Sequence, residues 1–509
     1  MHAGIDFGTS NCLISTAQSG AARPLPLTGD TDEMPSAIYV LKAAIAAQSI
    51  DDPRHQETLS RRIASARTQQ TAEVNRAKEK YERALSASRR HGNQQRMPAS
   101  WKEYMSTRVM TDSEIERQQR TVLQRELNAT AEEGYTQQGI AFALSGGGET
   151  TFGQEAISQN LLAGSDGFFI KSPKSFLGAS LHPRQLDVFQ EVSSRMLAHI
   201  KATGEQQVDE PIDSVVIGRP VNFHGTRGEE GNRQAIEILQ AAARKAGYKH
   251  VEFMLEPVAA AIDFERTLTE DNTVLVVDLG GGTTDCTVLR LGPSHRDKDH
   301  IERDVLAHSG SRIGGIDLDI QLAFHEFMPH FGKGTSRRDG LPIPQHIFLE
   351  ACSVNDLPAQ RRFGKEDLDF LCSRADEPEK LRRLLSLQRK AAMPRLSLTA
   401  EEAKIALSDA EIHSASLDYL EPRFVIEARR EVFEAAIEQQ LSKFAGLAHE
   451  AVRQAQVTPS LVYVTGGTAK SPVIRRALRQ ALGSVEIVAG NLFNGVVSGL
   501  ATHSESVYR

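Results

Sequence analysis

The sequence has few cysteines, and their positions argue against two kinds of domain, those held together by disulfide bonds and those held together by zinc. It contains four: Cys12, Cys286, Cys352 and Cys372. They form no CxxC pair and show no metal-ligand spacing, which argues against a disulfide framework and against a cysteine-based zinc site. Cys12 and Cys286 lie inside apolar strand patterns. We therefore expect small core residues in a reducing compartment.

Long apolar runs and an excess of positive charge are also missing. No run reaches the roughly 18 residues of a membrane-spanning helix. The start, MHAGIDFGTSN, lacks the basic and apolar regions of a secretory signal peptide. A net charge of −7 and a pI near 6.2 argue against a nucleic-acid interface. We expect a cytoplasmic protein that binds neither membrane nor nucleic acid.

What is present is a long chain of ordinary globular composition. Its 509 residues, 40% of them hydrophobic and 25% charged, exceed what one compact core holds, so two lobes are expected. Short β-type runs alternate with helical stretches, which indicates an α/β protein. The strand-like runs are Ala3–Phe7, Cys12–Thr16, Ala37–Leu41, Ser214–Ile217, Val251–Leu255, Thr273–Asp278 and Leu461–Thr465.

Two segments depart from this alternation. Residues 53–134 are rich in Gln, Arg, Glu and Ala, with apolar residues at helical spacing and a capping-box pattern at Thr111–Glu114. They predict an inserted helical hairpin, either an amphipathic pair that covers its own lobe or an arm that docks a partner. Residues 329–395 contain several Pro and Gly and predict an irregular insertion. Helical pattern then returns at Thr399–Lys404 and is expected to continue through Glu427–Ala455.

Two glycine-rich stretches repeat one design. Val276–Leu289 is VVDLGGGTTDCTVL and Gly4–Ser15 is GIDFGTSNCLIS. In each, an apolar strand leads to an Asp, a Gly turn with hydroxyl residues, and a second strand. Backbone N–H groups in such a turn can approach an anion closely. The stretches are neither P-loops nor Rossmann fingerprints, because no helix follows the glycines and no GKS or GKT occurs.

The carboxylates at these turns imply a cation. Asp6 and Asp278 would repel a phosphate held at the adjacent Gly turn unless a metal lay between them, and Mg²⁺ with retained waters suits this position. Two equivalent hairpins could thus hold a polyphosphate from both sides. Gly314-Gly315 and Gly466-Gly467, the latter before Thr468, fit the same plan. Each turn alone could equally be an ordinary tight turn, and we assign Gly146–Gly148 to a loop tip of the helical insertion.

Five segments together resemble a known family. GIDFGTSN, VVDLGGGTTD, RIGGIDLD, LEPVAAAI and VTGGTAKSP are similar to the signature segments of the heat-shock protein 70 (DnaK-type) ATPase domain. The segments IKSPKSFLGAS, IGRPVNF and VNDLPAQ resemble those of its YegD-like branch. The resemblance implies the actin-like two-lobed ATPase fold, with duplicated ribonuclease-H-like sheet cores flanked by helices.

The resemblance also implies a domain layout. We expect one lobe over residues 1–272 with the insertion 53–134, and a second over 273–509 with the insertion 329–395. The C-terminal helix is expected to return to the first lobe. The last ATPase motif is followed by little more than one helix, so we expect no peptide-binding domain.

Catalytic roles follow from the resemblance, residue by residue. Lys174, in SPKSFLG, matches the lysine next to the γ-phosphate, where a cation orients the attacking water; a solvated surface lysine is the alternative. Glu256 matches the glutamate near that water, although the helix dipole alone would favour it there. Together with Pro220, Glu256 would couple the cleft to lobe rotation. Asp278 and Thr283 complete the expected catalytic set.

Binding roles follow in the same way. Asp6 and Asp278 match the carboxylates around Mg²⁺, and Asp285 matches one linked to monovalent-cation sites, which makes K⁺ a further candidate. The nucleotide-contacting residues are expected to be Gly8, Thr9, Ser10, Gly280, Gly281, Gly282, Thr283, Gly314, Gly315, Glu401, Lys404, Gly466, Gly467, Thr468 and Lys470.

Three positions depart from the family at its adenosine end. Ile405 stands where a basic residue usually stacks on adenine, so the cationic contribution is lost. Lys470 stands where arginine is usual, and a point charge replaces a planar fork. Phe493, with Asn494, stands where acidic residues are usual. These departures make adenine specificity less secure than phosphate binding.

The sequence therefore supports a slow, Mg²⁺-dependent ATPase that binds ATP and ADP and acts as a nucleotide-controlled switch. Its protein partner would dock on 53–134 or 329–395. Calling it a chaperone rests on family analogy. The alternatives are a non-hydrolysing nucleotide-binding scaffold, a phosphotransferase on the same fold, for which we can assign no catalytic base, and a polymerising filament.

Overall fold

The computed structural model describes residues 1–41, 53–90, 110–123, 144, 149–163, 167–223, 228–296, 304–489 and 494–508. Contacts divide the chain into two compact units. One unit is Met1–Leu41 with Gly147–Arg509, and the other is Lys42–Gly146. Each is described by itself.

A sheet in the order β3-β2-β1-β8-β9, with β4 beside β2, forms the first core of the larger unit. β1 pairs antiparallel with β2 and parallel with β8. β2–β3 is antiparallel and β8–β9 is parallel. The strands are β1 (His2–Phe7), β2 (Asn11–Gln18), β3 (Ala21–Leu25), β4 (Met34–Pro35), β8 (Ser214–Arg219) and β9 (His250–Leu255).

A second sheet repeats this arrangement in the order β12-β11-β10-β15-β16. β10–β11 and β11–β12 are antiparallel, whereas β10–β15 and β15–β16 are parallel. The strands are β10 (Asn272–Leu279), β11 (Thr284–Leu291), β12 (Val305–Ser311), β15 (Leu461–Thr465) and β16 (Glu486–Ala489). Strand order and direction match those of the first sheet, which confirms the predicted duplicated two-lobed α/β fold.

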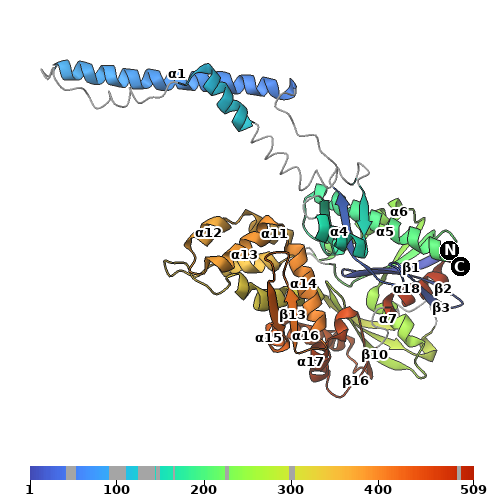
Figure 1. Ribbon diagram of the computed structural model, residues 1–509. Helices are drawn as coiled ribbons and strands as arrows, with labels where there is room; N and C mark the ends of the chain where they lie inside the picture. Colours follow the sequence, from blue (N-terminus) through green and yellow to red (C-terminus); the bar gives the residue numbers. More distant parts are fainter. Residues whose placement is uncertain are drawn as a thin grey trace. The chain divides into compact units, whose positions relative to one another are not determined.

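Two short helices connect the sheets. α7 (Glu256–Glu265) and α18 (Gly495–Val507) pack against each other, α18 also on β1, β2 and β8, and α7 on β10 and β11 (Figure 1). Gly499 lets them approach closely, because a Cβ there would lie 2.5 Å from the carbonyl carbon of Ala259. Residues of both sheets and both helices share one apolar cluster, including Val216, Val276 and Leu500.

Other helices cover the outer faces of the sheets. α5 packs on α6 and β2, and α16 packs on β11, β12 and α17. A small three-stranded sheet in the order β6-β5-β7 lies beside α4 and leads into a short 3₁₀ helix, η2. The bounds are α4 (Gly153–Ala163), α5 (Pro183–Val208), α6 (Glu229–Lys245), α16 (Glu438–Ala455), α17 (Pro472–Leu482), β5 (Ala37–Leu41), β6 (Thr150–Phe152), β7 (Gly167–Lys171) and η2 (Pro173–Phe176).

The prediction of an irregular insertion over residues 329–395 is wrong, because this segment is mostly helical. Its prolines and acidic residues begin helices rather than prevent them: Asp356 accepts from the N–H of Ala359 at 3.1 Å, and Asp367 from that of Phe370 at 2.9 Å. The helices are α10 (Gln345–Cys352), α11 (Leu357–Lys365), α12 (Leu368–Arg374), α13 (Pro378–Arg389) and α14 (Met393–Ala406). They bury Phe348, Phe363 and Leu384 in the core of the second sheet.

The prediction of helix from Thr399 through Glu427 is wrong as well. After α14 the chain forms an antiparallel hairpin of β13 (Ile412–Ser416) and β14 (Val425–Arg429). Exposed and buried residues alternate along β14, which is the period of a half-buried strand rather than of a helix. α15 (Arg430–Ala436) and α16 follow.

Two helices dominate the described part of the second unit. α1 (Pro53–Arg90) and a helix over residues 112–123 are held together where Gln70 exchanges two hydrogen bonds with the backbone of Met110, of 2.9 and 3.0 Å. The predicted capping box forms, with Thr111 N–H donating to Glu114 at 2.8 Å and Glu114 N–H donating to Thr111 Oγ1 at 3.3 Å. Gly146–Gly148 and residues 124–134 lie outside the described residues.

Two predictions from composition can be compared with the described residues. All four cysteines are free, and Cys12, Cys286 and Cys352 are buried, as expected of core residues. Across the ranges given above, no helix combines the length and apolar character that crossing a membrane requires.

Candidate functional site

The turns of the two Gly-rich hairpins touch each other. A Cβ on Gly281 would lie 3.1 Å from Cβ of Ser10, and one on Gly282 would lie 3.0 Å from the Thr9 side chain. A larger residue at Gly281 would also meet the Ser10 hydroxyl and would need the first turn to move by a few tenths of an ångström. The two stretches that repeat one design in the sequence thus meet in space.

The two later Gly pairs join the same place. Gly315 N–H donates to Gly280 O at 3.0 Å, and Thr468 Oγ1 donates to the same oxygen at 3.2 Å. Gly466 has a φ of 88°, a conformation that L side chains rarely adopt, and a Cβ there would lie 2.9 Å from Asp278 Oδ1. Four Gly-rich segments therefore surround one point, at the ends of β1, β10 and β15.

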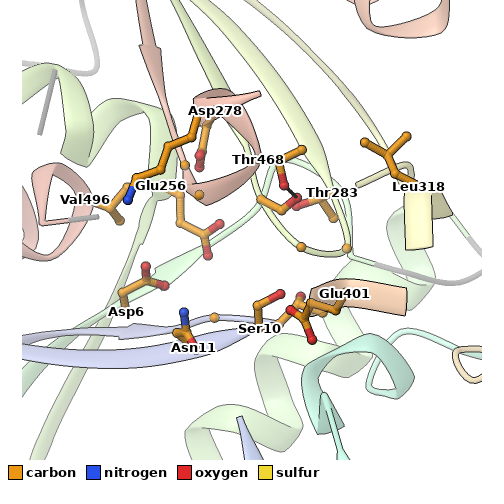
Figure 2. A pocket seen from close by; sticks show the side chains of 18 of the residues that line it. Asp6, Ser10, Asn11, Glu256, Asp278, Thr283, Leu318, Glu401, Thr468 and Val496 are labelled. Atoms are coloured by element: carbon orange, nitrogen blue, oxygen red, sulfur yellow. Dashed lines mark hydrogen bonds between the residues drawn. The ribbon is translucent and has the colours of Figure 1, made fainter. Parts of the chain in front are cut away.

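These turns line a cavity of about 440 Å³. Figure 2 shows Asp6, Glu256 and Asp278 pointing into a common space from different elements, with Ser10, Thr283 and Thr468 nearby. All of the predicted site residues line the cavity except Asp285, Gly314 and Gly315. Those three lie directly behind the turns.

Lys174 reaches the cavity from η2 and is only 5% exposed. Its Nζ donates a hydrogen bond of 2.5 Å to Oε1 of Glu256, the first residue of α7. Ser172, just before Pro173, has a φ of 56°. A residue before proline normally has an extended backbone, so the backbone at Ser172 is strained. This turn connects β7 to η2 and sets the direction of η2, which carries Lys174.

Negative charge exceeds positive charge around the cavity. Burial, reinforced by the charge of Glu256, raises the pKa of Asp6 to about 7. Burial and the same glutamate raise the pKa of Asp278 and of Asp285 well above the usual range. Burial alone would lower the pKa of Lys174, but Glu256 and Asp6 raise it. At this end of the cavity Lys174 is surrounded by Asp6, Asp278 and Glu256, with Asp285 close behind, so the site attracts further cations.

The carboxylates fit a hydrated metal ion. Oxygen donors with excess negative charge are what Mg²⁺ takes, and Mg²⁺ keeps several of its waters. Asp6, Asp278 and Asp285 do not appear among groups of described residues whose ligand atoms lie within 4.8 Å of one another. The donor set therefore suits contact through retained waters better than a direct three-ligand cage.

The far end of the cavity is built by α14. Lys404 forms an ion pair with Asp319 at 2.8 Å, and Glu401 forms one with Lys171 of β7 at 2.5 Å. Burial raises the pKa of Asp319 to about 6, although Lys404 opposes the shift. Ile405 is 60% exposed yet lines the cavity, so an apolar surface faces the opening.

Sequence reasoning missed several residues at this end. Asp319 stands in the quoted motif RIGGIDLD and Lys171 directly precedes SPK, so a search for charged partners of Glu401 and Lys404 could have found them. Leu318, in the same motif, and Phe433 line the cavity themselves. Phe433 carried no recognisable pattern. Lys470 lines it too. Phe493 lies outside the described residues.

Known proteins share this combination of segments. The family described as "Hsp70 protein" matches residues 178–337. The Chaperone protein DnaK of Thermus thermophilus is 26% identical over 306 residues, which cover 58% of this chain and 40% of that protein. The Chaperone protein dnaK3 of Synechococcus elongatus is 26% identical over 305 residues, which cover 58% of this chain and 32% of that protein.

The middle of the chain is thus similar to the heat-shock protein 70 family. The match to the family covers α7 with Glu256, the second Gly hairpin and Gly314-Gly315. The first hairpin and α14 lie outside it, but they repeat or complete the same cavity in the structure. The matched part of the chain spans well under half the length of these heat-shock protein 70 relatives.

Proposed function

We propose that this protein binds ATP with Mg²⁺ and hydrolyses it slowly to ADP and phosphate. The observation that carries the proposal is the contact between the two Gly turns directly above Asp6, Asp278 and the Lys174–Glu256 pair. A polyphosphate seated between the turns would meet backbone N–H groups from both sides and a cation-seeking carboxylate cluster below. Similarity to the heat-shock protein 70 family supports the choice of nucleotide.

Each residue at the phosphate end has a proposed role. The backbone of Gly8, Ser10 and Gly280–Gly282, with the hydroxyls of Thr9 and Thr283, binds the phosphate chain. Lys174 lies next to the γ-phosphate, where its ammonium orients the attacking water and offsets charge that develops as the bond to the leaving oxygen breaks. Glu256 accepts a hydrogen bond from that water and holds it in line.

The cation sites follow from the same carboxylates. Mg²⁺, when bound, neutralises charge on the phosphates, and Asp6 and Asp278 would hold it through its waters. Asp285, whose Oδ1 accepts from the N–H of Val221 at 3.2 Å, would serve a monovalent cation such as K⁺. Val221 follows Pro220, so the carboxylate also tethers the segment that would transmit lobe rotation.

The nucleoside end is proposed to bind adenosine. Glu401 and Lys404 would contact the sugar and base from α14, Gly466-Gly467 and Lys470 would lie beneath them, and Ile405 would pack on the base. Lys171 and Asp319, which pair with Glu401 and Lys404, would hold these side chains in position. Because this end departs from the family, we propose it as the less selective part of the site.

Lobe closure is the proposed output. We assign residues 1–272 and 273–509 to two lobes, with α18 returning to the first; its packing on β1, β2 and β8 supports this. Closure on ATP would change the surface offered to a protein partner, which we propose binds the 53–134 insertion or the helices of 329–395. The buried free cysteines and the similarity to the family support a cytoplasmic location. The segments IKSPKSFLGAS, IGRPVNF and VNDLPAQ support assignment to the YegD-like branch.

Single-turnover hydrolysis tests the proposal. With enzyme in excess over ATP and Mg²⁺ present, we expect slow formation of ADP that requires Mg²⁺ and is lost in Lys174→Ala while nucleotide binding persists. Nucleotide binding without hydrolysis in the parent protein would favour a second candidate function, a nucleotide-binding scaffold. The exposed Ile405, which would pack on the base, is the reason to consider it. Turnover that needs an added sugar would instead favour a phosphotransferase, for which the site offers no assigned base.

A further inference from the structure

A second cluster of ligand-type side chains lies on the helices of the 329–395 segment, away from the cleft. It consists of His346 and Glu350 of α10 and Glu366 at the end of α11. One ring nitrogen and one oxygen of each carboxylate all lie within 4.8 Å of one another. The residues lie outside the cavity lined by the Gly turns.

Helix geometry explains why the three side chains meet. His346 and Glu350 are four residues apart, so they lie one above the other on the same face of α10. α11 ends at Lys365, and Glu366 takes an extended conformation with its N–H bonded to Phe363 O at 3.2 Å. This turn brings Glu366 Oε1 to 3.9 Å from His346 Nε2.

Glu350 is the observation that points to a ligand. It is only 8% exposed, and its Oε1 accepts from Arg362 at 2.5 Å. Its Oε2 is fully buried and accepts no hydrogen bond from any residue in the described part of the chain. A buried carboxylate oxygen without a partner is costly, and a cation between Glu350, His346 and Glu366 would satisfy it.

A plain salt bridge with Arg362 is the competing explanation for Glu350. It accounts for one oxygen only, and the Arg362 side chain is 58% exposed, so it approaches from the solvent side. In metal sites the ligating carboxylates are themselves hydrogen-bonded to outer residues. Arg362 fits that part, because it orients Glu350 and leaves the second oxygen for a metal.

We propose that His346, Glu350 and Glu366 bind one Zn²⁺ ion that fastens α10 to the turn between α11 and α12. One imidazole nitrogen with two carboxylate oxygens suits zinc, whereas Mg²⁺ and Ca²⁺ prefer oxygen ligands alone. Bonds of about 2.0–2.2 Å in a tetrahedral site place ligand atoms roughly 3.4 Å apart. The three ligand atoms lie within 4.8 Å of one another, so the exposed His346 and the half-exposed Glu366 move closer to Glu350 on binding. Water fills the fourth position.

Zinc binding to the full chain tests the proposal, after chelator treatment and with saturating Mg²⁺ to occupy the cleft. We expect one equivalent of Zn²⁺ to bind and to raise the thermal midpoint by a few degrees. His346→Ala and Glu366→Gln should each weaken binding at least tenfold, because each removes a ligand from an exposed or half-exposed position where folding is not at risk. His308→Ala removes an exposed histidine of β12 and should leave binding unchanged.

Spectroscopy with Co²⁺ as the probe identifies the ligands independently of affinity. The parent should give a visible d–d spectrum that His346→Ala changes and His308→Ala does not. Equal zinc affinity in the parent and both ligand variants, or binding that Mg²⁺ abolishes, would overturn the proposal. Neither result bears on ATP hydrolysis, so this proposal and the proposed function can fail separately.

Discussion

The ammonium of Lys174 lies 2.5 Å from the carboxylate of Glu256, and both side chains are buried in the lining of the cavity between the Gly turns. The two residues come from different elements, the 3₁₀ helix η2 and the N-terminus of α7. A change in the position of η2 relative to α7 would therefore lengthen or break this contact.

Replacing Lys174 by Met should lower single-turnover hydrolysis at least a hundredfold, because the cation that offsets charge in the transition state is lost. It should also destabilise the nucleotide-free protein by about 3–5 kcal/mol, since a buried Glu256 remains unpaired. The double variant with Glu256→Gln should recover much of that stability but none of the rate. Urea unfolding and quenched-flow hydrolysis measure the two effects. Lys249→Met, at an exposed lysine, is the control; an equal loss of rate there would refute the assignment.

Substitution of Gly281 by Ala should weaken binding of Mg²⁺–ATP at least tenfold, because the new methyl group meets Ser10 and separates the two Gly turns. Isothermal titration of nucleotide measures the effect. Gly446→Ala is a matched control in α16, where a Cβ meets nothing within 4 Å. It should leave binding unchanged and stabilise the protein by roughly 0.5–1 kcal/mol. Unchanged affinity in Gly281→Ala would mean that the turns do not hold the phosphates.

Gly499→Ala should destabilise the protein by about 1–3 kcal/mol or more, because the backbone of Ala259 occupies the space that the methyl group needs. α7 and α18 would be forced apart between the two sheets. The urea midpoint is the measurement, again with Gly446→Ala for comparison. A midpoint at or above that of the parent would show that the helices can separate freely.

Asp319 should make stability depend on pH between about 4 and 6. Its pKa is raised from 3.8 to about 6 in the folded protein, mainly by burial. In that window the folded state keeps a proton that the unfolded state has lost, so this carboxyl group contributes less stability as pH rises. Asp319→Asn should therefore gain stability relative to the parent from pH 4 to 6, on the order of 1–3 kcal/mol.

Glu450 serves as a comparison for Asp319, because its pKa is shifted in the opposite direction. Arg453 lowers the pKa of Glu450 to about 2, so Glu450→Gln should lose stability relative to the parent as pH rises from about 2 to 4.5. Urea unfolding across the pH range measures both variants. A flat difference between Asp319→Asn and the parent would contradict the buried titration.

Ser172→Gly should stabilise the protein or leave it unchanged, whereas Ser172→Val should destabilise it by about 1–2 kcal/mol. The reason is the φ of 56°, which glycine adopts without strain and a β-branched residue does not. Thermal unfolding measures both. Since the turn directs Lys174, the Val variant should also hydrolyse ATP more slowly; a stable, fully active Ser172→Val would show that the turn does not direct it.

The sequence alone determined the local parts of this protein. Strand, turn and strand follow directly from apolar runs around Asp6 and Asp278 with glycines after them, which is the local pattern of a hairpin. The repetition of that pattern predicted two equivalent hairpins, and the family resemblance predicted the duplicated sheets to which they belong. The capping box at Thr111–Glu114 is equally local, and it formed as predicted.

Tertiary structure decided what local pattern could not. In residues 329–395 the prolines begin short helices, which only packing on the second sheet stabilises. The β13–β14 hairpin has an ambiguous sequence, and its exposed and buried faces exist only once it lies on the core. The pairs Lys404–Asp319 and Lys171–Glu401, and the cluster of His346, Glu350 and Glu366, join residues whose distance in space depends on how the elements pack. Spacing along the chain specifies a turn or a helix face, but the energy of a buried charge depends on neighbours that only the folded chain supplies.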